Sequence, residues 1–151
     1  MAEVWFYQLQ RRALDQVLPA LIERTLQRGW RAVVQARAPE RLQAIDDLLW
    51  TYADDSFLPH GSQAAGDPDL QRVWLTCGED NPNDARIRFL VDGAEAAPFL
   101  DAGYERLILL FDGRDEASLA AAREQWRSLK QGAAELSYWR ETEEGGWSKQ
   151  G

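Results

Sequence analysis

Apolar residues recur along the chain in two alternating patterns, compact runs and helical stripes. The first run, EVWFYQL over 3–9, is rich in strand formers and predicts a strand. Residues 13–29 then carry apolar side chains at three- and four-residue steps, which predicts a helix that ends at Gly29. Pro19 lies inside this stretch, so we expect it either to kink the helix or to mark a later start.

The same alternation continues as far as residue 141. It predicts a strand over 31–36, a helix from Pro39 to Trp50, strands over 73–77, 86–92 and 106–113, a short segment around 96–104, a helix over 116–131 and a strand over 134–141. Asp115 precedes the last helix, where its side chain can accept from the first free backbone N–H groups. Residues 53–70 are polar and contain glycine and proline, which predicts a loop.

The order of these elements predicts the fold class. Continuous apolar strands such as LILLF, within 106–113, indicate burial on both faces, as in a parallel sheet covered by helices. We therefore expect one α/β domain over 1–142, with a mostly parallel, mixed central sheet flanked by helices. Residues 143–151 are charged and contain glycine, and we expect them to form a flexible tail.

Charge and composition narrow the classes of function. The formal net charge of −8 repels phosphate backbones, so direct nucleic-acid binding would need a local basic patch. We therefore expect no direct binding of nucleic acid. Cys77 is the single cysteine and suits a reducing compartment. No apolar stretch approaches the ~20 residues of a membrane span, and no secretory signal begins the sequence. These features predict a soluble, cytoplasmic protein without a membrane partner.

Residues that would support enzyme chemistry are few. The loop after the first strand, QLQRRALDQ, has no glycine, so we expect a Rossmann-like fold without a phosphate-binding loop. No metal-ligand spacing joins His60 to Cys77, and we expect neither a metal nor a cofactor. Asp112 ends the strongest strand, where α/β enzymes often place catalytic groups, although F-D-G also reads as a turn. The alternative function is therefore a small hydrolase or nucleotide-binding enzyme with Asp112 and His60 near its active site.

Two stretches point to protein partners instead. In the helix over 116–131, three cations form a stripe beside an apolar stripe that contains Trp126. This face is either solvated, with cations suited to the helix dipole, or a pocket for an acidic peptide with a hydrophobic end. In DDSFLPHG, residues 54–61, Phe57 follows Trp50 in a polar loop and either packs on the core or contacts a partner. The three cations are Arg123, Arg127 and Lys130.

The segments VWFYQL, LLWTYADDSFLPHG, RLILLFDG and REQWRSLK, with SYW near the end, together resemble the chi subunit of bacterial DNA polymerase III. The similarity covers nearly the whole chain in order, and its most specific part is the L-W-x(6)-F-x-P-H block. The resemblance implies a non-catalytic α/β subunit of the clamp-loader assembly. It also implies two partners, the psi subunit and the acidic C-terminal tail of single-stranded DNA-binding protein (SSB). A third alternative remains, a chi-like protein that binds another partner such as a repair helicase.

The resemblance also implies which residues meet these partners. Basic and aromatic positions on the last helix serve the SSB tail in the family, and Leu119 stands where some members carry a lysine, which puts one basic contact in doubt. Trp50 and Phe57 match the tryptophan and phenylalanine that face psi, so DDSFLPHG is expected to be a docking loop with His60 as a structural neighbour. The expected SSB-tail site consists of Arg123, Trp126, Arg127 and Lys130.

Overall fold

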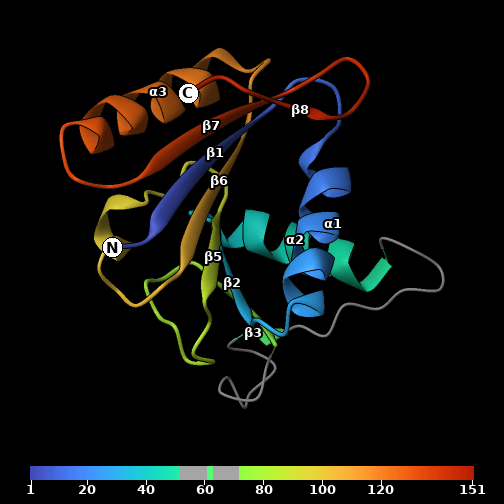
Figure 1. Ribbon diagram of the computed structural model, residues 1–151. Helices are drawn as coiled ribbons and strands as arrows, with labels where there is room; N and C mark the ends of the chain where they lie inside the picture. Colours follow the sequence, from blue (N-terminus) through green and yellow to red (C-terminus); the bar gives the residue numbers. More distant parts are fainter. Residues whose placement is uncertain (52–60, 63–71) are drawn as a thin grey trace.

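The computed structural model describes residues 1–51, 61–62 and 72–151, and it shows the predicted α/β fold (Figure 1). The predicted strands and long helices are present, with limits within two residues of those expected. The elements are β1 (Glu3–Leu9), α1 (Leu14–Gln27), β2 (Ala32–Gln35), α2 (Pro39–Thr51), β3 (Gly61–Ser62), β4 (Val73–Thr76), β5 (Ile87–Leu90), the 3₁₀ turn η3 (Ala97–Phe99), β6 (Arg106–Asp112), α3 (Glu116–Lys130), β7 (Leu136–Glu141) and β8 (Trp147–Lys149).

The strands of the described residues form one eight-stranded sheet in the order β3-β4-β2-β5-β6-β1-β7-β8. Neighbouring strands run parallel except for the last pair, in which β8 is antiparallel to β7. Helices α1 and α2 cover one face of the sheet and α3 covers the other (Figure 1). Alternate residues of β1 show the two faces, since Phe6 packs on the α3 side and Tyr7 on the α1 side.

The helix limits follow the local signals in the sequence. Helix α1 begins at Leu14, before Pro19, so the later start is wrong. Pro19 lies in the second turn, where it removes one backbone hydrogen bond of the helix, and its ring is buried against the core. Gly29 follows the helix at φ +82°, a left-handed conformation that favours glycine. Asp115 caps α3 as predicted, because its side chain accepts from the Ser118 backbone N–H at 3.0 Å.

Residues 143–151 do not form the expected tail, and the prediction of a domain limit at 142 is corrected accordingly. The chain turns at Gly145, whose φ is +86°, and returns as β8 along β7. The pairing continues beyond the strand, with the Gln150 N–H donating to the Tyr138 carbonyl at 2.7 Å. Trp147 packs on Tyr7, with ring centroids 4.7 Å apart. Packing of the Trp147 indole on the core holds β8 in place, because a short, charged segment has few other apolar contacts to stabilise it.

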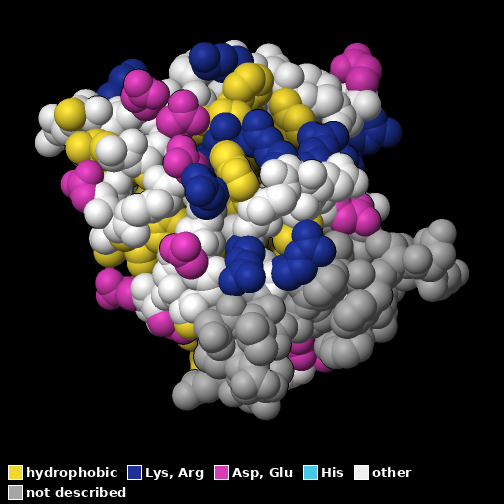
Figure 2. All heavy atoms as spheres, turned by 60° about the horizontal axis from the view of Figure 1, so that its bottom comes forward, with side chains coloured by type: hydrophobic (Ala, Val, Ile, Leu, Met, Phe, Trp, Pro, Cys, Tyr) yellow, Lys and Arg dark blue, Asp and Glu magenta, His cyan; other side chains and the backbone are white. Residues whose placement is uncertain are grey.

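The negative charge is unevenly distributed over the surface. Figure 2 brings forward the end of the molecule at which the strands begin, with Lys and Arg side chains gathered around a few hydrophobic ones. Asp and Glu side chains lie mostly on the left of this view. A chain of net charge −8 therefore carries a local concentration of cations on one face.

A buried arginine, Arg88 in β5, connects several parts of the fold. Its side chain has no exposed surface and lies 4.0 Å over the ring of Phe99. The guanidinium donates to Gln35 Oε1 from Nε at 3.0 Å and from Nη2 at 2.7 Å. It also donates to the Asp80 carbonyl and the Tyr104 hydroxyl, each at 2.9 Å. One side chain thus joins β2, β5, the loop after β4 and the segment after η3.

We predict that Arg88→Met lowers the free energy of unfolding by about 3 kcal/mol, because buried acceptors lose their donors while the side-chain volume is kept. Urea unfolding measures this difference. The matched control is Arg86→Met, two residues earlier and exposed, which should change stability by less than about 0.5 kcal/mol. Equal effects of the two substitutions would contradict this role for Arg88.

Candidate functional site

The four residues expected to meet an acidic peptide lie along one exposed flank of α3. Ala122 and Leu129 are buried against the sheet, whereas Arg123, Arg127 and Lys130 are exposed. Lys130 Nζ lies 5.2 Å from the ring centroid of Trp126, which is partly buried. Arg127 pairs with Glu124 at 3.2 Å, an exposed ion pair on the same helix. The flank is therefore a stripe of positive charge bordered by an indole. Glu124 partly neutralises this charge through its ion pair with Arg127.

The indole of Trp126 belongs to an aromatic cluster that the sequence did not reveal as a unit. Its ring meets Phe6 edge-on at 5.3 Å and Tyr138 edge-on at 5.5 Å. Burial raises the pKa of Tyr138 above its ordinary value, although the charges of Arg123 and Arg140 lower it. Strand β7 supplies Tyr138 to this cluster, and the SYW segment was the only sign of it in the sequence.

The segment after β8 also reaches this flank of α3. Gly151 accepts from the Tyr138 N–H through its carbonyl at 3.1 Å. A Cβ added at Gly151 would lie 3.3 Å from Cζ2 of Trp126 and 3.9 Å from Cβ of Tyr138. The candidate site is thus bounded by α3, by β7 and by the strand that follows it.

The residues expected to face psi cannot be placed in the same way. Trp50 lies in the last turn of α2, but its side chain is outside the described residues. Phe57 and His60 lie outside the described residues altogether. Trp50 and Phe57 as a docking pair, and His60 as their neighbour, stay predictions.

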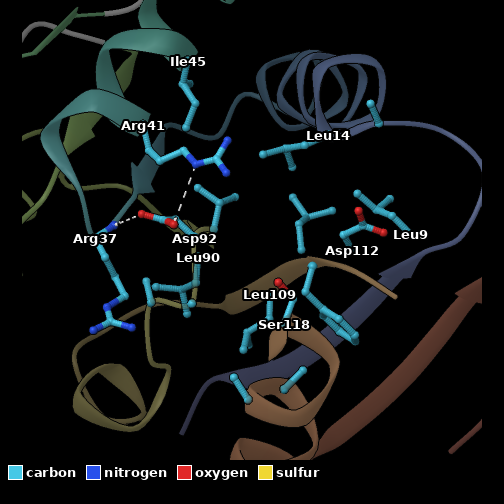
Figure 3. Close-up of a pocket in the computed structure, with 18 of the residues that line it drawn as sticks. Leu9, Leu14, Arg37, Arg41, Ile45, Leu90, Asp92, Leu109, Asp112 and Ser118 are labelled. Carbon is cyan, nitrogen blue, oxygen red and sulfur yellow. Dashed lines mark hydrogen bonds and ion pairs between the residues drawn. The ribbon is translucent and has the colours of Figure 1, made fainter. Parts of the chain in front are cut away.

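A cavity of about 520 Å³ opens at the carboxyl ends of β1, β5 and β6, between all three α-helices (Figure 3). Open α/β sheets commonly bind ligands at this position, so the alternative enzyme site would lie here. Its lining is mixed: Leu14 and Ile45 face Leu109 across the space, and charged side chains such as Arg41 stand at its wall. Asp112 lies in its wall, as the alternative function requires.

Two carboxylates of this cavity, Asp112 and Asp92, hold turns. Asp112 accepts from the backbone N–H of Arg114 at 2.9 Å and from its Nε at 3.0 Å. The backbone hydrogen bond and the nearby guanidinium lower the pKa of Asp112 below its ordinary value. Asp92 accepts from the Arg37 and Ala38 N–H groups at 3.1 and 3.0 Å, at the start of α2. These contacts match the turn reading of Asp112 rather than a general base.

A carboxylate of the protein occupies the place that a phosphate takes in nucleotide-binding α/β folds. The N–H groups of Gln10, Arg11 and Arg12, in the loop after β1, donate to Glu141 Oε1 at 3.1, 2.7 and 2.9 Å. The other oxygen of Glu141 accepts from Arg12 Nε at 2.5 Å. Successive backbone N–H groups of this kind form an anion site, and here the internal anion is Glu141. The loop lacks glycine, and its donors are already engaged.

Residues 1–51, 61–62 and 72–151 contain no group of three or more His, Cys, Asp or Glu side chains placed to hold a metal ion. Within the same ranges, every helix is too short or too polar to cross a membrane.

Comparison with known proteins gives two matches. The family model described as "DNA polymerase III chi subunit, HolC" matches residues 1–137. A curated relative from Rickettsia prowazekii (strain Madrid E), "Probable DNA polymerase III subunit chi", is 23% identical over 117 residues, which cover 74% of this chain and 71% of the relative. The matched region of the family model includes all of α3 and ends within β7.

We predict that Glu141 makes stability depend on pH. Its folded-state pKa is about 2 against an ordinary 4.5, so its ionised form stabilises the fold above about pH 4.5. This stabilisation, roughly 3 kcal/mol, is lost as the pH falls from 4.5 toward 2. Urea unfolding between pH 7 and pH 2.5 measures it.

In Glu141→Gln the loss should already be present at pH 7, and the slope below pH 4.5 should be reduced. Glu143→Gln, at an exposed position of the same hairpin, serves as the control and should retain the slope. An unchanged slope in Glu141→Gln would show that other carboxylates cause the acid sensitivity.

Proposed function

The chain belongs to the family of DNA polymerase III chi subunits, and we propose that it is a non-catalytic, cytoplasmic accessory subunit that links the clamp-loader assembly to SSB. In this proposal it binds the acidic C-terminal tail of SSB on α3. The observation that carries the proposal is the exposed flank of α3, where three cations border a half-buried indole. The internal carboxylate at the loop after β1 supports a role without nucleotide binding.

The chemistry of the flank fits the ligand that the family implies, an acidic peptide with a terminal phenylalanine. Arg123 can meet the terminal carboxylate, because the planar guanidinium binds both oxygens of a carboxylate. Trp126 and Tyr138 offer ring edges and faces for the phenylalanine. Lys130, near the Trp126 ring, adds a point charge for the acidic residues. Arg127 can contribute once it leaves Glu124.

We predict that Arg123→Ala weakens binding of an SSB-tail peptide about tenfold or more, since a charge-assisted hydrogen bond contributes roughly 1.5–3 kcal/mol. Glu124→Gln should tighten binding, because it releases Arg127 from its ion pair. Fluorescence anisotropy with a labelled peptide, over a salt series, measures both, and affinity should fall as salt rises. Removing the terminal phenylalanine should cost at least as much as Arg123→Ala.

Arg41→Ala is the control for this experiment, because Arg41 is an exposed arginine on α2, away from the α3 flank. It should bind the peptide like the wild type. If Arg123→Ala and Arg127→Ala also bind like the wild type, the tail site lies elsewhere on the protein.

The second proposed partner is the psi subunit, and the support is the resemblance at Trp50 and Phe57. We predict that Phe57→Ala weakens psi binding by about 2 kcal/mol or more, the scale of an interface hot spot, while the melting temperature stays unchanged. Calorimetry with purified psi and thermal unfolding of the variant measure the two quantities. Normal psi binding with a much lower melting temperature would assign Phe57 to the core.

A further inference from the structure

The face of the sheet opposite α3 carries three tryptophans on three adjacent strands. Trp5 of β1, Trp139 of β7 and Trp147 of β8 lie on the α1 side of the sheet and are partly buried. The rings of Trp5 and Trp139 have centroids 6.1 Å apart. Helix α1 packs against β2 and β6, so these outer strands present their indoles beside the helix. We call Trp5, Trp139 and Trp147 the indole platform.

Each indole of the platform has a cation over its ring. The Arg106 guanidinium lies 3.7 Å from the centroid of Trp5. Lys149 Nζ lies 6.0 Å from that of Trp139, and the Arg12 guanidinium lies 5.8 Å from that of Trp147. The platform therefore alternates aromatic faces with positive charge.

Next to the platform, four arginines stand side by side at the amino ends of consecutive strands. The Arg106 N–H donates to the Arg86 carbonyl at 3.3 Å, and the Arg86 N–H donates to the Arg31 carbonyl at 3.2 Å. The Ala32 N–H donates to the Arg72 carbonyl at 2.9 Å, which completes the series. Adjacent strands are spaced by about 4.8 Å, so the series is extended rather than clustered. We call Arg72, Arg31, Arg86 and Arg106 the arginine row.

Within residues 1–51, 61–62 and 72–151, two ion pairs between this row and acidic side chains can be described, and both acidic side chains are exposed. Glu3 lies 3.6 Å from Arg106, and Glu105 lies 3.5 Å from Arg86. The Arg86–Glu105 pair is 60% and 57% exposed, so water screens it and a polyanion can displace it at little cost. This end of the molecule is the one on which Figure 2 shows Lys and Arg around hydrophobic side chains.

Two buried donors on this face have no hydrogen bond within the described residues. They are Nε1 of Trp139 and Nε of Arg106. Nε of Arg106 faces the Glu3 carboxylate at 3.6 Å, whereas Nε1 of Trp139 has no such neighbour among these residues. Buried donors in folded proteins are nearly always satisfied, so the Trp139 indole points to an acceptor supplied by a ligand.

We infer that the indole platform and the arginine row form a binding surface for single-stranded nucleic acid. An extended line of guanidinium groups matches a chain of phosphates, and indoles at one end of the line match unpaired bases that stack on them. Aromatic side chains on adjacent strands of a sheet bind single strands in the same way in other folds. A net charge of −8 would repel a nucleic acid if the cations were spread evenly over the surface. On this face Lys and Arg side chains are gathered, so the local potential can attract phosphates.

Fluorescence anisotropy with a labelled 20-nucleotide thymidine strand tests the inference. The wild type should bind at low salt, more tightly than it binds a duplex of equal length. The double variant Arg72→Gln, Arg86→Gln should bind at least about tenfold more weakly. Its salt slope should fall by about 0.7 for each lost phosphate contact. The double variant Arg37→Gln, Arg41→Gln, which removes the same charge from exposed positions near α2, should bind like the wild type.

Tryptophan fluorescence tests the platform separately. Stacked thymidine should quench the wild type, and Trp139→Phe should lose part of that quenching, whereas Arg37→Gln, Arg41→Gln should retain it. The inference is wrong if the wild type does not bind the strand at low salt, or if both double variants weaken binding equally. It is also wrong if a polyglutamate peptide of equal charge competes as well as the DNA, since the occupant would then be an acidic peptide.

Discussion

The fold depends on one buried carboxylate, Glu141, which holds the two ends of the chain together. Its oxygen accepts from three consecutive N–H groups of the loop that leads from β1 into α1. Through Arg12, which also donates to the Gly145 carbonyl at 2.9 Å, the same contact fixes the hairpin between β7 and β8. Without an anion at this point, three backbone donors would lack partners, and both the start of α1 and the last strand would lose their anchor. The arrangement that stabilises the fold also closes the place where a nucleotide phosphate would sit.

Alternate residues of the same strands serve the two proposed surfaces. Phe6 and Tyr138 point to the α3 side and build the aromatic cluster beside the cationic flank. Tyr7 and Trp139, their neighbours in sequence, point to the opposite face and belong to the cluster beside α1. Neighbouring strands such as β1 and β7 can in this way present one aromatic surface to a peptide and another to a different ligand, because a strand offers successive side chains to opposite faces.

Periodicity was sufficient for the elements with long, unbroken patterns, such as the apolar run over 106–113 and the stripes of α1 and α3. It failed for β8, because a three-residue strand behind a charged turn has too few positions to show a period. Arg88 and Glu141 were missed because a buried, fully bonded charge looks like a surface residue in the sequence. The cations of α3 were visible because they lie within one helix. The arginine row was not, because residues 31, 72, 86 and 106 become neighbours only through the strand order β6-β5-β2-β4.

The position of β1 between β6 and β7 sets the order in which the protein can be assembled during its synthesis. Strand β1 is synthesised about a hundred residues or more before its partners, since Val4 pairs with Leu107 and Leu136. Until β6 has emerged, the apolar EVWFYQL run has no neighbouring strand to pair with. The nascent chain therefore exposes this apolar run through most of translation. During this interval a chaperone would protect the run from aggregation.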